Sequence, residues 1–209
     1  MRSTAPGSAV PGSTAPGSRL PPPVVIVPGL RGHVPDHWPT VLAEGLAAAG
    51  RDVRTVPPLT GDRDQLDREA RVAALEETVA RTPGPPILVA HSAGVMTTVH
   101  WAQRSRRPVH GALLATPPDF DTPLPEGYPT PEALRHRGWT PTPRSALPFP
   151  SIVAMSDDDP LAPAHRVSAL AAAWGSRLIG LGAVGHLNPA SGYGPWVQAA
   201  ELVRELEFD

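Results

Sequence analysis

Two residue types are missing from this chain of 209 residues, and each absence removes a class of chemistry. Without cysteine there can be no disulfide, no thiol nucleophile and no cysteine-ligated zinc. All 18 basic residues are arginine, so Schiff-base catalysis, pyridoxal phosphate attachment and a P-loop lysine are excluded as well. If the protein is an enzyme that forms a covalent intermediate, its nucleophile must be a hydroxyl or a carboxylate.

The chain also lacks a strong net charge and any long apolar run. The net charge is -2 and the charges of both signs are interspersed, so we expect neither nucleic acid nor an anionic membrane as a partner. No stretch approaches the roughly 20 apolar residues of a membrane span. No apolar segment follows Arg2, as a signal peptide would require. We therefore expect a soluble, cytoplasmic protein with one sizeable core.

The first 23 residues form a repeat of small and turn-forming residues. Ser-Thr-Ala-Pro-Gly-Ser occupies 3–8 and recurs at 13–18. Such a composition buries little apolar surface, so residues 1–23 are predicted to be a disordered tail. The folded domain is then expected over 24–209.

From residue 24 onward, short apolar runs alternate with amphipathic segments. The runs at 24–27 and 87–90 are continuously apolar, as expected of parallel strands that are covered on both faces. The alternation predicts an α/β fold, with a doubly wound, mainly parallel sheet of about six strands and helices on both faces. We expect strands at 24–27, 53–56, 87–90, 111–116, 150–155 and 177–181, and helices at 36–49, 64–81, from the turn after 91 to about 104, 162–174 and 195–206.

The segment 117–148 is rich in proline and has no periodicity, apart from a possible helical turn or two at 131–137. Phe120, Tyr128 and Trp139 could line a substrate pocket there. The alternative, which we favour, is a surface crossover whose aromatic side chains cover the core.

Ser92 stands at an abrupt change from strand to helix. The apolar run 87–90 is followed by His91-Ser92-Ala93-Gly94, close to the G-x-S-x-G nucleophile elbow of α/β-hydrolases, with Ala90 in place of the first glycine. Such a turn tolerates only small neighbours and exposes the serine hydroxyl above the sheet. The alternative is a loop serine that caps the next helix.

Three consecutive aspartates, Asp157, Asp158 and Asp159, follow the predicted strand 150–155. They are candidates for the acid of a triad, for a Mg²⁺ or Ca²⁺ site, or for a solvated turn. The alternating ligand spacing of a calcium loop is absent, so we expect no metal. We choose Asp159 as the acid because Pro160 fixes the chain directly after it, and we leave Asp157 and Asp158 to the solvated turn.

His186 follows the last predicted strand, in the loop Gly185-His186-Leu187-Asn188. A serine hydroxyl needs a neighbouring imidazole to take its proton, and a carboxylate to orient that imidazole. The order Ser92, Asp159, His186 is the order of an α/β-hydrolase triad. The alternative is one more surface histidine, since the chain has eight.

Acyl transfer also needs N–H donors for the oxyanion. We expect one from Ala93 and one from the glycine-containing loop 28–32, with Leu30 as the first choice and Gly29 as the second. We assign Gly29, His91 and Trp139 to the substrate pocket, with a packing or supporting role for His91.

Several of these motifs occur in the order found in a known family. The chain resembles the small serine hydrolases similar to retinoblastoma-binding protein 9 and the bacterial YdeN proteins. This resemblance implies Ser92 as nucleophile, Asp159 as acid and His186 as base, in a compact α/β-hydrolase fold with little or no lid and esterase-like activity on small substrates. It rests on Val27-Pro28-Gly29 with His37-Trp38, Ala90-His91-Ser92-Ala93-Gly94, Leu147-Pro148-Phe149-Pro150-Ser151, Ser156 to Pro160, Ala172-Ala173-Trp174-Gly175, Gly185-His186-Leu187-Asn188 and Ser191-Gly192-Tyr193-Gly194-Pro195-Trp196.

The sequence therefore predicts a carboxylesterase-like serine hydrolase that cleaves a small ester, or a thioester or amide, through an acyl-enzyme and without a cofactor. Two alternatives stay open. One is a binding module for a protein partner built on a hydrolase scaffold, and the other is a thioesterase or cyclase of a biosynthetic pathway.

Overall fold

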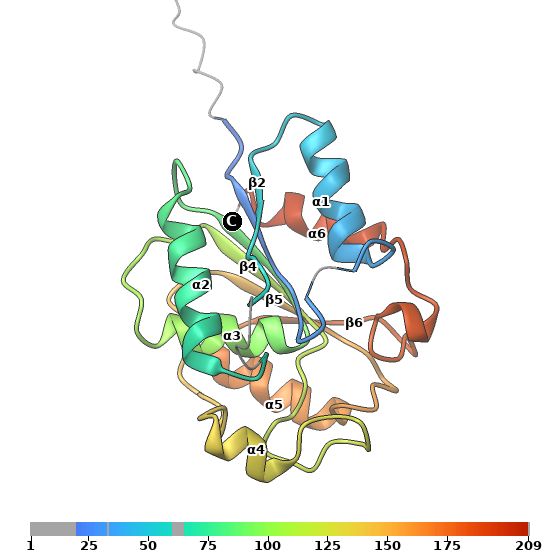
Figure 1. Cartoon of the computed structure of the whole chain (residues 1–209). Coiled ribbons are helices and arrows are strands. Elements are labelled where there is room, and N and C mark those ends of the chain that lie inside the picture. Colours follow the sequence, from blue (N-terminus) through green and yellow to red (C-terminus); the bar gives the residue numbers. More distant parts are fainter. Residues whose placement is uncertain (1–19, 33, 60–64, 209) are drawn as a thin grey trace, which may run out of the picture.

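The computed structural model of the chain describes residues 20–32, 34–59 and 65–208. Six parallel strands form one sheet in the order β2-β1-β3-β4-β5-β6 (Figure 1). Nearly all of the tail predicted at 1–23 lies outside the described residues. The strands are β1 (Val24–Val27), β2 (Val53–Thr55), β3 (Ile87–His91), β4 (Gly111–Ala115), β5 (Ser151–Met155) and β6 (Arg177–Gly180).

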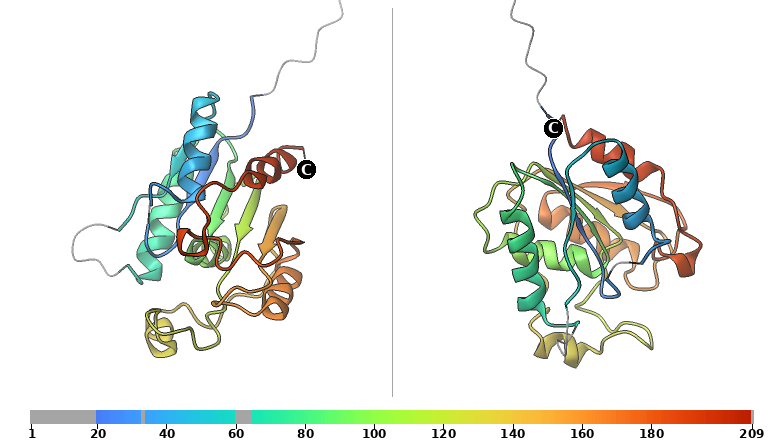
Figure 2. Two further views of the ribbon diagram at one scale, coloured as in Figure 1. Left: turned by 90° about the vertical axis from the view of Figure 1, so that its right-hand side faces the viewer. Right: turned by 45° about the horizontal axis from the view of Figure 1, so that its top comes forward.

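Helices cover both faces of this sheet, as Figures 1 and 2 show. One apolar core packs α2, α3 and α5 against the sheet, and a second packs α1 and α6 against the opposite face. The predicted doubly wound α/β fold is thereby confirmed. The helices are α1 (Trp38–Ala48), α2 (Arg68–Ala80), α3 (Ala93–Ala102), α4 (Pro131–His136), α5 (Ala164–Trp174) and α6 (Gln198–Glu205).

The observed boundaries differ from the expected ones by a few residues. Helix α5 begins at Ala164 because Pro163 takes the N-cap position, and α6 begins at Gln198 instead of 195. The expected start of α2 at 64 lies outside the described residues. None of the described helices is both long enough and apolar enough to cross a membrane.

The strand order places a topological switch between β1 and β3, which are neighbours although β2 separates them in sequence. Because all strands are parallel, the loops that leave their carboxyl ends gather at one edge of the sheet, where open α/β sheets bind ligands. The loop 28–32 leaves β1 there, and Ser92 leaves β3 beside it, since Val27 pairs with Ala90 in the ladder.

The segment 117–148 packs beside this edge and contains the short helix α4. Asp119 anchors its start through two hydrogen bonds from the Arg166 guanidinium of α5, at 2.6 and 3.1 Å. A third apolar cluster, which includes Phe120, Leu134 and Trp139, joins the segment to α3.

Candidate active site

Ser92 occupies the turn between β3 and α3 with a backbone that few residues other than glycine adopt. Its φ is 57° and its ψ is -126°. The strain is held by the surrounding structure, because the Ser92 N–H donates to the Ala115 carbonyl at 3.0 Å. The Ser92 hydroxyl makes no capping hydrogen bond to α3, so the interpretation as a helix-capping serine is wrong.

Gly94, the last residue of the motif, lies where no side chain fits. A Cβ at residue 94 would lie 2.0 Å from the carbonyl oxygen of Val27, at the end of β1. The helix α3 can therefore start this close to β1 only with glycine at this position.

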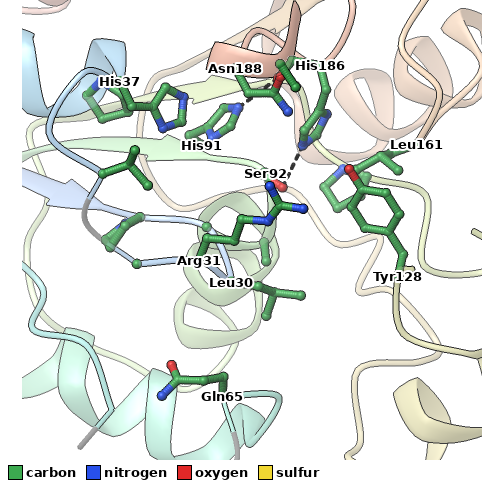
Figure 3. Close-up of a pocket in the computed structure, with 18 of the residues that line it drawn as sticks. Leu30, Arg31, His37, Gln65, His91, Ser92, Tyr128, Leu161, His186 and Asn188 are labelled. Carbon is green, nitrogen blue, oxygen red and sulfur yellow. Dashed lines mark hydrogen bonds between the residues drawn. The ribbon is translucent and has the colours of Figure 1, made fainter. Parts of the chain in front are cut away.

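His186 joins the other two predicted residues. Its Nε2 lies 2.8 Å from Ser92 Oγ (Figure 3). Its Nδ1 lies 2.9 and 3.0 Å from the two carboxylate oxygens of Asp159. The side chains of His186 and Asp159 are 5% and 2% exposed. The structure thus brings together three residues that lie after β3, β5 and β6.

Two further histidines hold the backbone of the loop that carries His186. His91 Nε2 lies 3.0 Å from the His186 carbonyl oxygen, and His37 Nε2 lies 3.2 Å from the Leu187 carbonyl oxygen. Burial lowers the pKa of both imidazoles, that of His91 well below its usual value. Each ring is therefore neutral near pH 7, and each can donate its Nε2–H to the carbonyl.

Asp158 makes contacts that the prediction of a solvated turn did not include. Its Oδ1 accepts hydrogen bonds from the Gly185 N–H at 2.7 Å and from Ser156 Oγ at 2.9 Å. The Gly185 bond lowers the pKa of this carboxyl, although the group is exposed. Asp158 thus ties the β5 loop to the β6 loop, whereas the exposed Asp157 fits the predicted turn. Within the described part of the chain, no three or more His, Asp or Glu side chains are grouped to share a metal ion.

Arg71 of α2 holds the loop of the expected oxyanion donors. Its Nη2 donates to the carbonyl oxygens of Pro28 at 2.7 Å and Gly29 at 3.1 Å, and its Nε donates to Thr97 Oγ1 at 3.3 Å. Burial lowers the pKa of Arg71 to about 10, so the guanidinium stays charged at neutral pH. In a trans peptide the N–H points opposite to the carbonyl. These contacts therefore direct the N–H groups of Gly29 and Leu30 away from Arg71.

A pocket of about 490 Å³ opens above Ser92. Four of the residues predicted around the nucleophile line it: Gly29, Leu30, His91 and Ala93. The segment 117–148 adds Pro118, Phe120, Leu124, Gly127, Tyr128 and Pro129, so it forms one wall of the pocket and is more than the surface crossover that we favoured.

The assignment of Trp139 to the pocket is wrong. Its side chain is fully buried, and its indole N–H donates to the Leu66 carbonyl at 2.7 Å. The ring packs edge-on against His100 and Phe120, with centroids 5.6 Å away in each case. Trp139 therefore anchors the pocket wall from behind.

The supporting residues Arg71, Asp158, His37 and Ser191 were not predicted. One signal was available for Arg71, because residues 71, 75 and 78 share a helix face and Leu75 marks that face as buried. Ser191 Oγ accepts the His186 N–H at 3.1 Å. The sequence indicates this contact less directly, through Gly185, the residue before His186. A Cβ on Gly185, where φ is +56°, would meet this oxygen at 2.4 Å.

The comparison with known families agrees with this geometry. A family model described as serine hydrolase matches residues 24–205. The chain belongs to the serine hydrolase family. No curated protein matches this serine hydrolase significantly in sequence.

Solved structures of similar fold include hydrolases of bacterial origin. A YdeN-like hydrolase of Pectobacterium atrosepticum is 24% identical with a TM-score of 0.73, and the match covers 88% of this chain and 90% of that one. The ydeN gene product of B. subtilis is 18% identical with a TM-score of 0.70, over 88% and 98% of the two chains. Est1E of Butyrivibrio proteoclasticus, in a structure with bound ferulic acid, is 14% identical with a TM-score of 0.64, over 90% and 87%. At these identities the likeness shows the α/β-hydrolase fold of this serine hydrolase. The resemblance to retinoblastoma-binding protein 9 stays a prediction.

Proposed function

We propose that this serine hydrolase cleaves small carboxylic esters through an acyl-enzyme on Ser92, with His186 as general base and Asp159 as the residue that orients it. One observation carries the proposal. The hydrogen bonds from Ser92 Oγ through His186 to Asp159 form an unbroken chain in a buried site. A serine hydroxyl is a poor nucleophile until such a pair removes its proton.

In the first half of the reaction, His186 Nε2 takes the Ser92 proton as Oγ attacks the ester carbonyl carbon. Asp159 accepts the Nδ1–H and stabilises the positive charge that forms on the imidazole. When the tetrahedral intermediate collapses, His186 returns the proton to the leaving alkoxide and the acyl group stays on Ser92. Water then attacks the acyl-enzyme in the same way, and the carboxylic acid leaves.

The negative oxygen of the intermediate is stabilised by backbone N–H groups. The Ala93 N–H is one donor, because the first residue of a helix has no intrahelical acceptor. The second donor comes from the loop 28–32, whose Gly29 and Leu30 N–H groups point away from Arg71. Donors that are fixed before the reaction stabilise the developing charge at little reorganisation cost.

The direct test is covalent labelling together with turnover. A fluorophosphonate probe is expected to label the wild-type chain and not Ser92→Ala, and only the wild type should hydrolyse short- and medium-chain 4-nitrophenyl esters. Labelling that persists in Ser92→Ala would remove Ser92 from the role of nucleophile. A labelled wild type that turns over thioesters but no ester would favour the thioesterase alternative. A folded wild type that is neither labelled nor active would favour a binding module.

A further inference from the structure

Arg31 stands in the loop that supplies an oxyanion donor. Its side chain is exposed and lines the mouth of the pocket, and in Figure 3 its guanidinium points toward Ser92. The backbone beneath it is fixed, because the Gly29 carbonyl accepts hydrogen bonds from both the Gly32 N–H and Arg71. The charge is thus carried on an anchored turn and faces the reacting atoms.

Among the residues that the structure describes, none that lines the pocket around this guanidinium carries a negative charge, since no aspartate or glutamate is among them. The other basic groups there are imidazoles, and burial lowers the pKa of His37 and His91. Of the described lining residues, Arg31 is therefore the one with a permanent positive charge, and the walls around it are mainly apolar.

Several other surface arginines of the described chain are held in ion pairs. Arg166 pairs with Asp119 at 2.6 Å, and Arg144 with Asp121 at 3.4 Å. For Arg31 no ion pair is found among residues 20–32, 34–59 and 65–208. A guanidinium offers paired N–H donors that match the two oxygens of a carboxylate.

We propose that Arg31 selects anionic esters, in which a carboxylate lies a few bonds from the scissile carbonyl. The inference rests on the proposed esterase function and names its substrate class. The apolar walls contact the methylene groups between the two ends of such a substrate, while the carboxylate meets Arg31 at the mouth. Arg31 is then a specificity residue and takes no part in the chemical step.

The experiment compares matched substrates that differ in charge. Mono-4-nitrophenyl adipate carries a carboxylate on the acyl chain, and 4-nitrophenyl hexanoate is its neutral counterpart. A second pair, 4-carboxyphenyl butyrate and phenyl butyrate, places the charge on the leaving group. We expect kcat/KM to favour the anionic member of at least one pair roughly tenfold, and the pair that responds locates the carboxylate.

The variants separate Arg31 from the general charge of the molecule. Arg31→Gln should bring the ratio of the two kcat/KM values to about one, mainly through KM, whereas Arg31→Lys should keep part of it. Arg106→Gln, at an exposed arginine outside the pocket lining, is the matched control and should leave the ratio unchanged.

Two outcomes would overturn the inference in different ways. Equal kcat/KM values within both pairs, or a preference that survives in Arg31→Gln, would reject the role of Arg31 and leave the esterase function standing. Absence of turnover of all four esters would reject the proposed function and the inference with it.

Discussion

The two sides of Ser92 are built in different ways. On the base side, His37, His91, Ser191 and Asp158 each hold a backbone group of the loop that carries His186. On the acyl side, the loop 28–32 is held by Arg71, and the facing wall is mainly apolar.

From this difference we infer that the base side sets the rate of the chemical step and that the acyl side sets the choice of substrate. Two of the base-side contacts, those of His37 and His91, are buried, and breaking either one leaves its buried carbonyl partner unsatisfied at a cost of about 1–3 kcal/mol. Such contacts keep one geometry for every substrate. The acyl side has fewer internal polar contacts and leaves more of its surface available to a ligand. We therefore expect substitutions there to alter which ester is cleaved.

The largest effect is expected from breaking the base side. Asp159→Asn keeps the shape of the side chain, but it favours the wrong imidazole tautomer and removes the charge that stabilises the imidazolium. We expect kcat for 4-nitrophenyl butyrate to fall by about 10⁴. Asp157→Asn, two residues away and exposed, is the matched control and should retain near wild-type kcat. If the loss occurred in the control variant instead, the acid would be misassigned by two residues.

An intermediate effect is expected from removing the hydrogen bonds that hold the loop 28–32 on the acyl side. Arg71→Met keeps most of the buried side-chain volume but removes the hydrogen bonds to the Pro28 and Gly29 carbonyls. Both peptides can then rotate, and we expect kcat to fall by roughly 10- to 100-fold with KM changed by less than about threefold.

The measurement should separate this positioning role from simple destabilisation. Rates are expressed per active site titrated with the fluorophosphonate, and Arg81→Met, at the exposed C-cap residue of the same helix, is the control. Arg71→Lys should recover part of the lost kcat. A variant with lowered melting temperature but unchanged kcat per titrated site would mean that Arg71 only stabilises the fold.

The last prediction concerns the stability of the acyl-side wall and not turnover. His100 Nε2 lies 3.0 Å from the Trp139 carbonyl oxygen, and burial lowers the pKa of His100 to about 4. The unfolded chain takes up this proton near pH 6.5, so between the two values it binds more protons than the folded chain. The free energy of unfolding should therefore fall by roughly 2–3 kcal/mol as the pH drops from 6.5 to 4.

The melting temperature measured between pH 7.5 and 4.5 tests this sign. His37 and His91 act in the same direction, so His100→Gln should reduce the slope without abolishing it. His165→Gln, at an exposed histidine, should leave it unchanged. A slope equal to that of the wild type in His100→Gln would show that this imidazole does not contribute.

Much of the fold could be predicted from the sequence because the central strands are covered on both faces. Every residue of β1, β3 and β4 is buried, and this produces continuous apolar runs that are easily recognised. Helix ends were less predictable, since they depend on local contacts such as the proline at the start of α5.

The proximity of Ser92, Asp159 and His186 could be inferred because each lies in the segment that follows a strand, and parallel strands bring such segments to one edge. The supporting residues could not be derived in the same way. An arginine such as Arg71 is typical of a solvated helix face, and its role becomes visible only when the Pro28 and Gly29 carbonyls are placed beside it. Trp139 and Tyr128 look equivalent in an aperiodic segment, and only the packing of His100 and Phe120 distinguishes them.

The contact of Gly94 with Val27 has a mechanical consequence. Because α3 rests directly on the end of β1, the proposed nucleophile Ser92 and the loop 28–32, from which we expect an oxyanion donor, are carried by elements in direct contact. We therefore expect movement of the outer wall to change the width of the entrance more than the distance between Ser92 and the loop 28–32.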